Sequence, residues 1–292
     1  MRAFSQYDPI AVAVWFFATA GIVMFSMNPI LLAISLVGAI SLFLALGVSQ
    51  GLRSHLVTML FFVMITIINP LVSHNGMTVL FVINDAPITA EAFAYGAASA
   101  AMIAAVLYWF RSFSFIMTSD KLLYLFGRLS PKLSLILSMG LRYVPLFGRQ
   151  AKKVSQAQRA LGLYKDENII DRIRGGMRVF SVMVTWALEN GIVTADSMEA
   201  RGYGIGKRTH FSMFRFRACD GVLLTVTLVL TLCVGVSMAA GGMDFVFYPT
   251  IKMASTSELG VLGYVAYAIL AFIPTIIETE ERIRWKYLRS RI

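Results

Sequence analysis

Long apolar runs, broken by short polar segments, occupy most of this chain. Each of six runs is long enough, or nearly so, to form a helix across a hydrocarbon layer of about 30 Å, which needs roughly 20 residues. The first two runs are separated only by Met27-Asn28-Pro29, which predicts a tight helical hairpin. The pattern is compatible with roughly four to seven spans, and six fits it best. The predicted spans lie at 11–27, 29–48, 55–71, 90–110, 219–241 and 259–277.

The longest polar stretch lies at 111–217, between the fourth and fifth predicted spans. It contains two apolar, helix-like runs at 133–141 and 179–192, and the segment between them is basic and amphipathic. This pattern predicts two or three long helices that lie against a membrane surface. The sequence therefore predicts an all-α polytopic membrane protein, with about six transmembrane helices and a long helical module inserted before the last two.

Composition agrees with the membrane class, and the distribution of charge orients the chain. Hydrophobic residues make up 58% of the sequence, charged residues only 14%, and the mean hydropathy is +0.71. Most of the 26 lysines and arginines lie in 111–217 or in the tail from 282 to 291. Because an excess of Lys and Arg marks the cytoplasmic side, we expect both termini and 111–217 to be cytoplasmic, and the loops at 72–88 and 242–258 to lie outside. The expected regions are a membrane region at 1–110, a cytoplasmic helical module at 111–217, and two spans with a basic cytoplasmic tail at 218–292.

The predicted spans carry no ionisable side chain near their centres. Carriers of polar cargo usually bury such groups in the membrane, so this weighs against a self-contained secondary transporter, which is kept as the alternative function. One side of the fourth span is instead rich in small residues, which let another helix approach closely. That helix belongs either to the same chain or to a second membrane subunit. The small residues are Gly96, Ala97, Ala100, Ala101, Ala104 and Ala105.

Three glycines at alternate positions, Gly202, Gly204 and Gly206, precede Lys207 and resemble part of a phosphate-binding loop. A Walker A loop requires glycine at position 201 and Ser or Thr at position 208, and arginine occupies both. The glycines also follow a helical pattern rather than open one, as at a helix C-terminus. We therefore expect no nucleotide site, no enzymatic activity and no cofactor. The scattered histidines also predict no metal site; they are His55, His74 and His210.

Arg201 stands at the end of this helical pattern, where a cation interacts favourably with the helix dipole. Gly202 removes side-chain bulk beside it, and Ser197 and Thr194 share its helix face. A planar guanidinium on such a helix end fits a groove of another protein, where it binds a carboxylate or backbone carbonyls. The competing interpretation is an arginine that contacts only solvent or lipid phosphate.

The residues around Arg201 resemble the transmembrane T component of energy-coupling factor (ECF) transporters, which are ABC-type importers of vitamins and metal ions. The signature of that family is two cytoplasmic helices that each end in a short Ala-Arg-Gly-like motif. The second motif is similar to SMEARGYG at 197–204, and the first is similar to AQRALG at 157–162, in which Leu161 replaces the arginine. Further similar segments are Asp8-Pro9, NPLVSHNG at 69–76, TSDKL at 118–122, LRYVP at 141–145 and ETEERIRW at 278–285.

The resemblance implies a coupling subunit rather than an enzyme. In this family the T component transmits ATP-driven movements of two cytoplasmic ABC ATPases to a small membrane subunit that captures the vitamin or metal ion. The expected partners are therefore these three proteins and the lipid bilayer of the cell membrane, and no nucleic acid. By resemblance, two helix ends dock the ATPases. The docking residues are Ala200, Arg201 and Gly202 at one end, and Ala160, Leu161 and Gly162, with Arg159, at the other. Ser197 and Glu199 support the helix face at the first of these ends.

Leu161 departs from the family motif. Arg159 lies two positions away, about 200° around the helix axis, so it does not simply replace an arginine at 161. Either the first contact is mainly apolar or Arg159 acts from another face, and the two ATPase contacts are then unequal, as a heterodimeric ATPase pair allows. The basic strip formed by Arg149, Lys152, Lys153 and Gln156 also has two interpretations, a lipid-headgroup face or a protein contact. The sequence names no cargo, because specificity in this family resides in another polypeptide.

Overall fold

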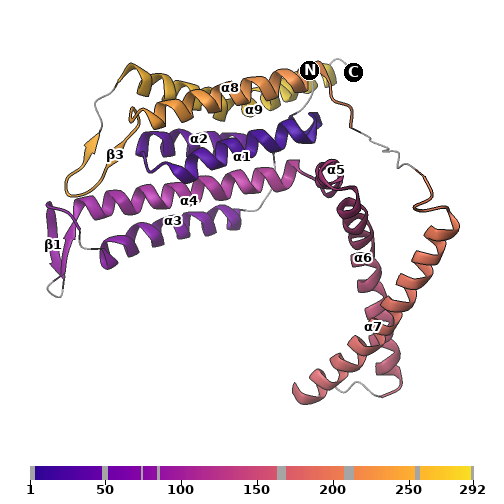
Figure 1. The fold of residues 1–292 in the computed structure, drawn as a ribbon. Helices are drawn as coiled ribbons and strands as arrows, with labels where there is room; N and C mark the ends of the chain where they lie inside the picture. Colours follow the sequence, from indigo (N-terminus) through magenta and orange to yellow (C-terminus); the bar gives the residue numbers. More distant parts are fainter. Residues whose placement is uncertain are drawn as a thin grey trace. The chain divides into compact units, whose positions relative to one another are not determined.

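The computed structural model describes residues 4–47, 52–73, 75–83, 86–162, 169–206, 214–253 and 257–290. The chain divides into two compact units. The first consists of Met1–Leu122 and Phe214–Ile292, and the second of Leu123–Met213. Helices predominate in both (Figure 1).

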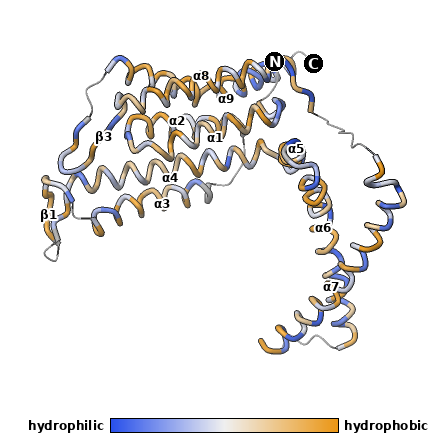
Figure 2. The backbone as a smooth tube through the Cα atoms, in the orientation of Figure 1, coloured by the Kyte–Doolittle hydropathy of each residue, from blue (hydrophilic) through white to orange (hydrophobic). Residues whose placement is uncertain are grey.

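The first unit is a bundle of long apolar helices (Figures 1 and 2). Helix α4 packs against α1, α2 and α3, while α9 packs against α2 and α8. A short 3-10 helix, η1 (Phe4–Gln6), precedes the bundle. Its helices are α1 (Pro9–Phe25), α2 (Pro29–Ala45), α3 (Leu52–Val72), α4 (Ala90–Ile116), α8 (Ala218–Ala239) and α9 (Glu258–Arg289).

Polar caps and prolines mark where the first two helices begin. The Asp8 carboxylate accepts a hydrogen bond from the Ile10 N–H at 2.9 Å, and Pro9 occupies the first helical position. Asn28 caps α2 in the same way, directly before Pro29. Proline suits this position because its missing N–H would have no helical partner there. The predicted helical hairpin around Asn28 is therefore confirmed.

Two tryptophans tie the core of the bundle together. Trp15 Nε1 donates to the Leu270 carbonyl at 3.0 Å, and Trp109 Nε1 donates to the Ser35 hydroxyl at 2.9 Å. The two indoles meet edge to face, with ring centroids 5.3 Å apart. Because a buried indole N–H needs a partner, these bonds connect α1 to α9 and α4 to α2 at fixed positions.

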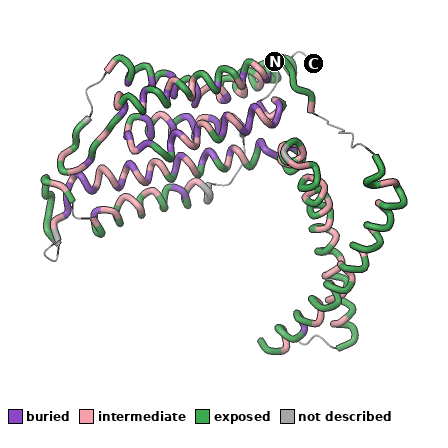
Figure 3. Tube along the Cα trace, in the orientation of Figure 1, coloured by how far each residue is buried: buried purple, intermediate pink, exposed green. Residues whose placement is uncertain are grey.

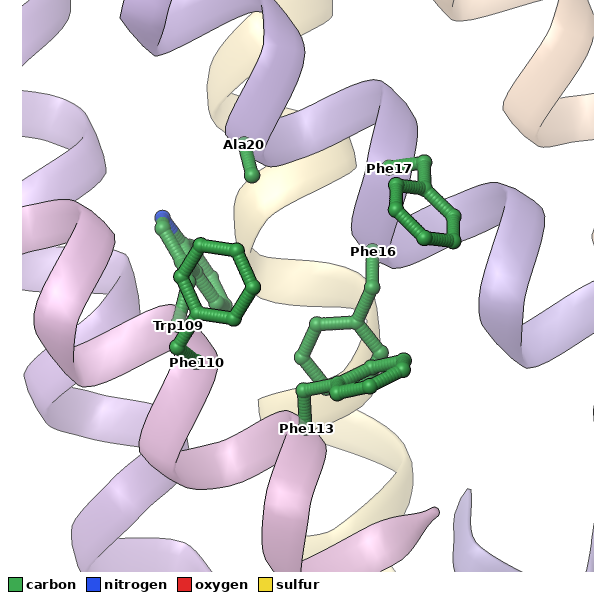
Figure 4. A pocket seen from close by; sticks show the side chains of 6 residues that line it. All are labelled: Phe16, Phe17, Ala20, Trp109, Phe110 and Phe113. Atoms are coloured by element: carbon green, nitrogen blue, oxygen red, sulfur yellow. The ribbon is translucent and has the colours of Figure 1, made fainter. Parts of the chain in front are cut away.

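The outward faces of the bundle are apolar as well, so buried and exposed positions alternate along helices that are hydrophobic throughout (Figures 2 and 3). An aromatic hollow of about 30 Å³ between α1 and α4 illustrates this (Figure 4). Phe17 is 68% exposed and Phe110 is 51% exposed. A helix that is hydrophobic all round belongs in a membrane or a large core, which fits a bilayer around this unit. The hollow is lined by Phe16, Phe17, Ala20, Trp109, Phe110 and Phe113.

Apolar helices occur at every predicted span, which confirms the all-α polytopic membrane class. In the part of the chain that the structure describes, 4 helices are long and apolar enough to cross a membrane. Helices α1 and α2 are shorter, with 17 residues each, so the number of crossings stays a prediction. The four longer segments are His55–Val72, Ala90–Ile116, Ala218–Ala239 and Glu258–Arg289.

The small residues of α4 pack inside the bundle. A Cβ atom at Gly96 would lie only 2.9 Å from the Thr66 carbonyl oxygen of α3. Ala100, Ala104 and Ala105 are at most 5% exposed. Of the two interpretations of this stripe, the structure therefore favours packing within the same chain.

Two short β-hairpins, absent from the sequence prediction, lie in the segments expected to be outside loops. Strand β1 (Val79–Ile83) pairs antiparallel with β2 (Ala86–Thr89), and β3 (Phe245–Val246) pairs with β4 (Lys252–Met253). The Thr89 side chain, at the end of β2, accepts the Ala92 N–H at 3.3 Å and so caps α4. The first hairpin thus leads directly into a helix start.

Two of the family-like segments, TSDKL at 118–122 and ETEERIRW at 278–285, contact the N-terminal residues of the chain. The Phe4 N–H donates to the Glu278 carboxylate at 3.1 Å. Lys121 Nζ donates to the carbonyls of Ser5 and, at 2.9 Å, Ile116, which lies in the last turn of α4. Burial lowers the pKa of the Lys121 ammonium below its usual range. Both segments therefore have a structural role in fixing the N-terminal residues.

The second unit contains two long helices, as the sequence predicts. Helix α5 (Ser119–Leu129) leads into this unit, and α6 (Pro131–Ala160) and α7 (Ile169–Ala200) follow, with 30 and 32 residues. The apolar runs at 133–141 and 179–192 lie within them.

Side-chain contacts hold α6 against α7. The Tyr143 hydroxyl lies 2.7 Å from the Thr194 hydroxyl. The Phe147 ring stacks on Tyr143, with centroids 5.6 Å apart, and meets the Trp186 indole edge to face at 5.5 Å. These contacts fix the relative positions of the two helices.

Candidate docking site at two helix ends

Helix α7 ends in a tight turn at the Ala-Arg-Gly motif. The Gly202 N–H donates to the Glu199 carbonyl at 2.9 Å, and the Tyr203 N–H donates to the Met198 carbonyl at 3.0 Å. This pair of bonds is the Schellman arrangement, in which the residue after the cap is left-handed. Gly202 fulfils that requirement with a φ of 82°. Arg201 is consequently the C-cap residue, and its side chain is exposed.

Helix α6 also ends at a left-handed glycine, in the Ala-Leu-Gly motif. The Gly162 N–H donates to the Arg159 carbonyl at 3.0 Å, and the φ of Gly162 is 69°. Leu161 is the C-cap residue and is 73% exposed. Ala160 is the last helical residue, as Ala200 is in α7. The central side chains of both motifs thus occupy equivalent positions.

Arg201 borders a groove of about 380 Å³ between α6 and α7. Thr194 and Ser197 line the same groove as Arg201. Glu199 does not line it and contributes its backbone carbonyl to the turn instead. The complete lining is Met139, Arg142, Tyr143, Leu146, Asn190, Val193, Thr194, Ser197, Met198 and Arg201.

Arg142 brings a second guanidinium to this groove, which sequence reasoning did not foresee. Its neighbour Tyr143 is held by the Thr194 hydroxyl, and that hydroxyl in turn donates to the Asn190 carbonyl at 2.7 Å. The signal in the sequence was the family-like segment LRYVP, but nothing local indicates that it lies beside Arg201. Two cationic groups on one groove favour an anionic partner group.

The two motif ends belong to different helices of the same unit, and the structure does not place Leu161 in the Arg201 groove. Arg159 is exposed on α6, also outside that groove. Gly204, at a φ of 93°, continues the turn after α7, while Lys207 lies outside the described residues. Within the described ranges no three or more His, Cys, Asp or Glu side chains form a metal-binding group; His74 and His210 lie outside those ranges.

Comparison with known proteins identifies a transporter family. The family model described as cobalt transport protein, CbiQ, matches residues 2–211. The energy-coupling factor transporter transmembrane protein EcfT of Listeria innocua is 34% identical over 102 residues, which cover 34% of this chain and 38% of that protein. EcfT 1 of Listeria monocytogenes is 30% identical over 106 residues, and EcfT of Lacticaseibacillus paracasei is 32% identical over 102 residues. Both matches cover 34% of this chain, and they cover 40% and 39% of those relatives.

The chain thus spans about two fifths of the length of the curated relatives it matches, whereas the family model covers most of the chain. The chain therefore belongs to the family of transmembrane T components of ECF transporters.

Proposed function

We propose that this chain is the transmembrane coupling subunit of an ECF-type ABC importer. Two cytoplasmic ABC ATPases hydrolyse ATP, and the chain transmits their movement to a separate membrane subunit that captures a vitamin or a metal ion. One observation carries the proposal: two long helices of the second unit each end in an Ala-X-Gly turn with a left-handed glycine, and the central side chain of each is exposed.

Each helix end docks one ATPase. At the end of α7, Arg201 presents its donors to a carboxylate or to backbone carbonyls, because the guanidinium is planar and always charged. Arg142, on the same groove, adds a second charge. At the end of α6, Leu161 presents an aliphatic side chain that is 73% exposed and gains by entering an apolar pocket. The two contacts are therefore chemically unequal, which suits two different ATPase subunits.

The uncovered surface of the second unit supports a role in assembly. No described residue of α6 is buried, and in α7 Gly175 is the one described residue that is. Large apolar side chains are exposed along both helices, with Val144 at 69% and Leu188 at 66%. Apolar patches larger than a few hundred Å² mark protein or membrane contacts. The capture subunit and the membrane surface are the proposed covers.

The coupling path follows from the way in which α6 and α7 are held together. Closure of the ATPase pair displaces both docked helix ends. The two helices are joined by contacts of Tyr143 with Thr194 and of Phe147 with Trp186. The stacking of Phe147 on Tyr143 links these two contacts. The pair therefore moves as one element, and the two helices do not bend separately. The displacement then reaches the capture subunit, which is reoriented and releases its cargo inside. The chain itself supplies docking surfaces and stiff helices, and ATP chemistry stays with the ATPases.

The membrane orientation forms part of the proposal. The excess of Lys and Arg in 111–217 and in the C-terminal tail supports a cytoplasmic location for that module and for both termini, with the chain in the cell membrane. The two hairpins then lie on the outer side. The regions 1–110, 111–217 and 218–292 act as membrane region, coupling module and final pair of spans.

Co-purification tests this function. The chain is expressed with the ABC ATPases of its host, purified in mild detergent through a tag, and assayed for the ATPases that it retains. Wild type is expected to retain them in stoichiometric amount, and Arg201→Ala is expected to lose most of one. Arg149→Ala, which removes an exposed arginine from the middle of α6, is the matched control and is expected to behave as wild type. Absence of ATPase from the wild-type preparation would contradict the coupling role, and full retention by Arg201→Ala would contradict the docking role of that residue.

A further inference from the structure

Helix α9 continues beyond the bundle of the first unit as an exposed tail. Two contacts fix the level at which it leaves the bundle. The Glu278 carboxylate accepts a hydrogen bond from the Phe4 N–H at 3.1 Å. The Arg282 guanidinium lies against Gly47, at the C-terminal end of α2, where a Cβ atom would collide with it. Every residue from 282 to 289 is exposed, and this segment is the α9 tail.

One side of the α9 tail is cationic. Arg282, Lys286 and Arg289 lie four and then three positions apart, which places them on one face of the helix. They form the cationic face. Trp285 borders this face, because it lies three positions after Arg282 and four before Arg289. The α9 tail contains no carboxylate, so its own residues do not neutralise these charges.

The length of α9 gives the depth of the cationic face in a bilayer. The span predicted at 259–277 has no charged residue and is about 28 Å long as a helix, which matches a hydrocarbon layer of ~30 Å. At the same rise per residue, Arg282 lies about 7 Å and Arg289 about 18 Å beyond the end of this span.

This depth brings the cationic face to the lipid charges. Polar head groups extend roughly 5–8 Å beyond the hydrocarbon on each side. Long cationic side chains reach back toward them. The distance that remains is comparable with the Debye length of ~8 Å at physiological ionic strength, so screening leaves much of the attraction intact.

Large apolar and aromatic side chains share the α9 tail with the cations. Trp285 is 65% exposed, Tyr287 56% and Ile283 64%. Trp and Tyr are enriched at membrane–water interfaces, where their rings lie at the level of the head groups. The head-group layer accommodates these rings together with the cations, and it begins where the tail leaves the bundle.

We propose that the cationic face of the α9 tail binds anionic phospholipid head groups. Phosphate oxygens accept hydrogen bonds from the Arg282 and Arg289 guanidiniums and from the Lys286 ammonium. A cluster of Lys and Arg directly after a transmembrane helix is the pattern that recognises anionic lipids, and Arg284 completes such a cluster of four. Zwitterionic lipids carry their own cation beside the phosphate and compete poorly. Lipid binding at this face does not depend on the coupling function.

The test is lipid retention by the purified full chain. The protein is exchanged in mild detergent into micelles that contain equal amounts of dioleoyl phosphatidylglycerol, which is anionic, and dioleoyl phosphatidylcholine, which is zwitterionic. The bound lipids are counted by native mass spectrometry, and we expect phosphatidylglycerol to be preferred. The double variant Lys286→Gln/Arg289→Gln should reduce that preference by roughly fivefold for each cation removed. The control Arg149→Gln/Lys152→Gln removes the same charge from exposed positions of α6 and should keep the preference.

A salt series tests the wild-type chain without any substitution. Lys286 and Arg289 lie in the last turn of α9, where cations also stabilise the helix end, so the double variant is checked by its melting temperature. If that variant melts early, the salt series decides. Exchange in 1 M instead of 0.1 M ammonium acetate shortens the Debye length from about 10 to about 3 Å and should weaken the preference for phosphatidylglycerol.

Four outcomes would overturn the proposal. Equal retention of the two lipids by wild type would exclude recognition of the anionic head group, and a preference that 1 M salt leaves unchanged would exclude an electrostatic origin. An unchanged preference in a stably folded tail variant would place the lipid elsewhere. An equal loss of preference in the α6 control would show an effect of net charge alone.

Discussion

The turn that ends α7 is open to a direct test through Gly202→Ala. Gly202 has a φ of 82°, a left-handed conformation that a side chain makes unfavourable by roughly 1–2 kcal/mol. Steric crowding adds little, because the nearest atom to a new Cβ would be Ile205 Cδ1 at 3.6 Å. The two hydrogen bonds of the turn contribute about 1 kcal/mol each, so a strain of this size offsets roughly half to all of their contribution and makes opening of the turn much easier, but it is too small to unfold α7.

Opening of the turn moves Arg201 from its position at the helix end. If docking requires the closed turn, the strain reduces ATPase affinity by about fivefold to thirtyfold, the factor that corresponds to 1–2 kcal/mol. The assay is titration of the purified chain, in detergent or nanodiscs, with the ATPase pair. Circular dichroism should show unchanged helix content, and hydrogen exchange should be faster at Gly202 and Tyr203, whose amides form the turn.

Gly191→Ala is the matched control for this prediction. Gly191 lies inside α7, and a Cβ there would meet no atom within 4 Å. Alanine favours a helix over glycine by about 1 kcal/mol, so this variant should be as stable as wild type or more so, with unchanged ATPase affinity. Wild-type affinity in Gly202→Ala would refute the reasoning that the closed turn presents Arg201.

Three further predictions concern other parts of the chain. Gly96→Ala should lower the free energy of unfolding by about 1–3 kcal/mol, measured by thermal melting, because the new Cβ would lie 2.9 Å from the Thr66 carbonyl oxygen; wild-type stability would show that α3 is not held there. Leu161→Arg and Arg159→Ala together test the departure from the family motif. We expect Leu161→Arg to change the amount of ATPase that the chain retains and Arg159→Ala to leave that amount unchanged. Wild-type retention in both variants would remove the end of α6 from the docking site. Burial lowers the pKa of Lys121 below 10.5, so between the lowered pKa and 10.5 the unfolded chain binds more protons than the folded chain. The free energy of unfolding should therefore rise with pH in that window. Lys121→Met should lose this rise, and an equal slope of the free energy of unfolding against pH in both proteins would contradict the prediction.

Local features of the sequence were sufficient to predict the helical framework. Asp8 and Asn28 each precede a proline and begin an apolar run, and both cap a helix in the structure. The glycines at 162 and 202 follow helical patterns, and both take the left-handed conformation that ends a helix. Each of these signals depends on residues within one or two turns, which is why it can be read without the fold.

Features that depend on contacts between distant segments were not predictable. Arg142 shares a groove with Arg201 only because Tyr143 and Thr194 hold α6 against α7. Strand β1 was also missed, since a short apolar run between two predicted spans gives a weak signal for a hairpin.

Site-specific cross-linking tests the central claim most directly. Arg201→Cys and Leu161→Cys are made in a chain whose own cysteines are replaced by Cys219→Ser and Cys233→Ala, and each is labelled with a photoactivated benzophenone. Arg149→Cys, in the middle of α6, serves as the control position. The account predicts that positions 201 and 161 cross-link to ATPase subunits in the assembled complex, each to its own subunit if the pair is heterodimeric, and that position 149 does not. Cross-links from 149 alone, or none from 201 and 161 in a complex that contains both ATPases, would contradict docking through the two helix ends.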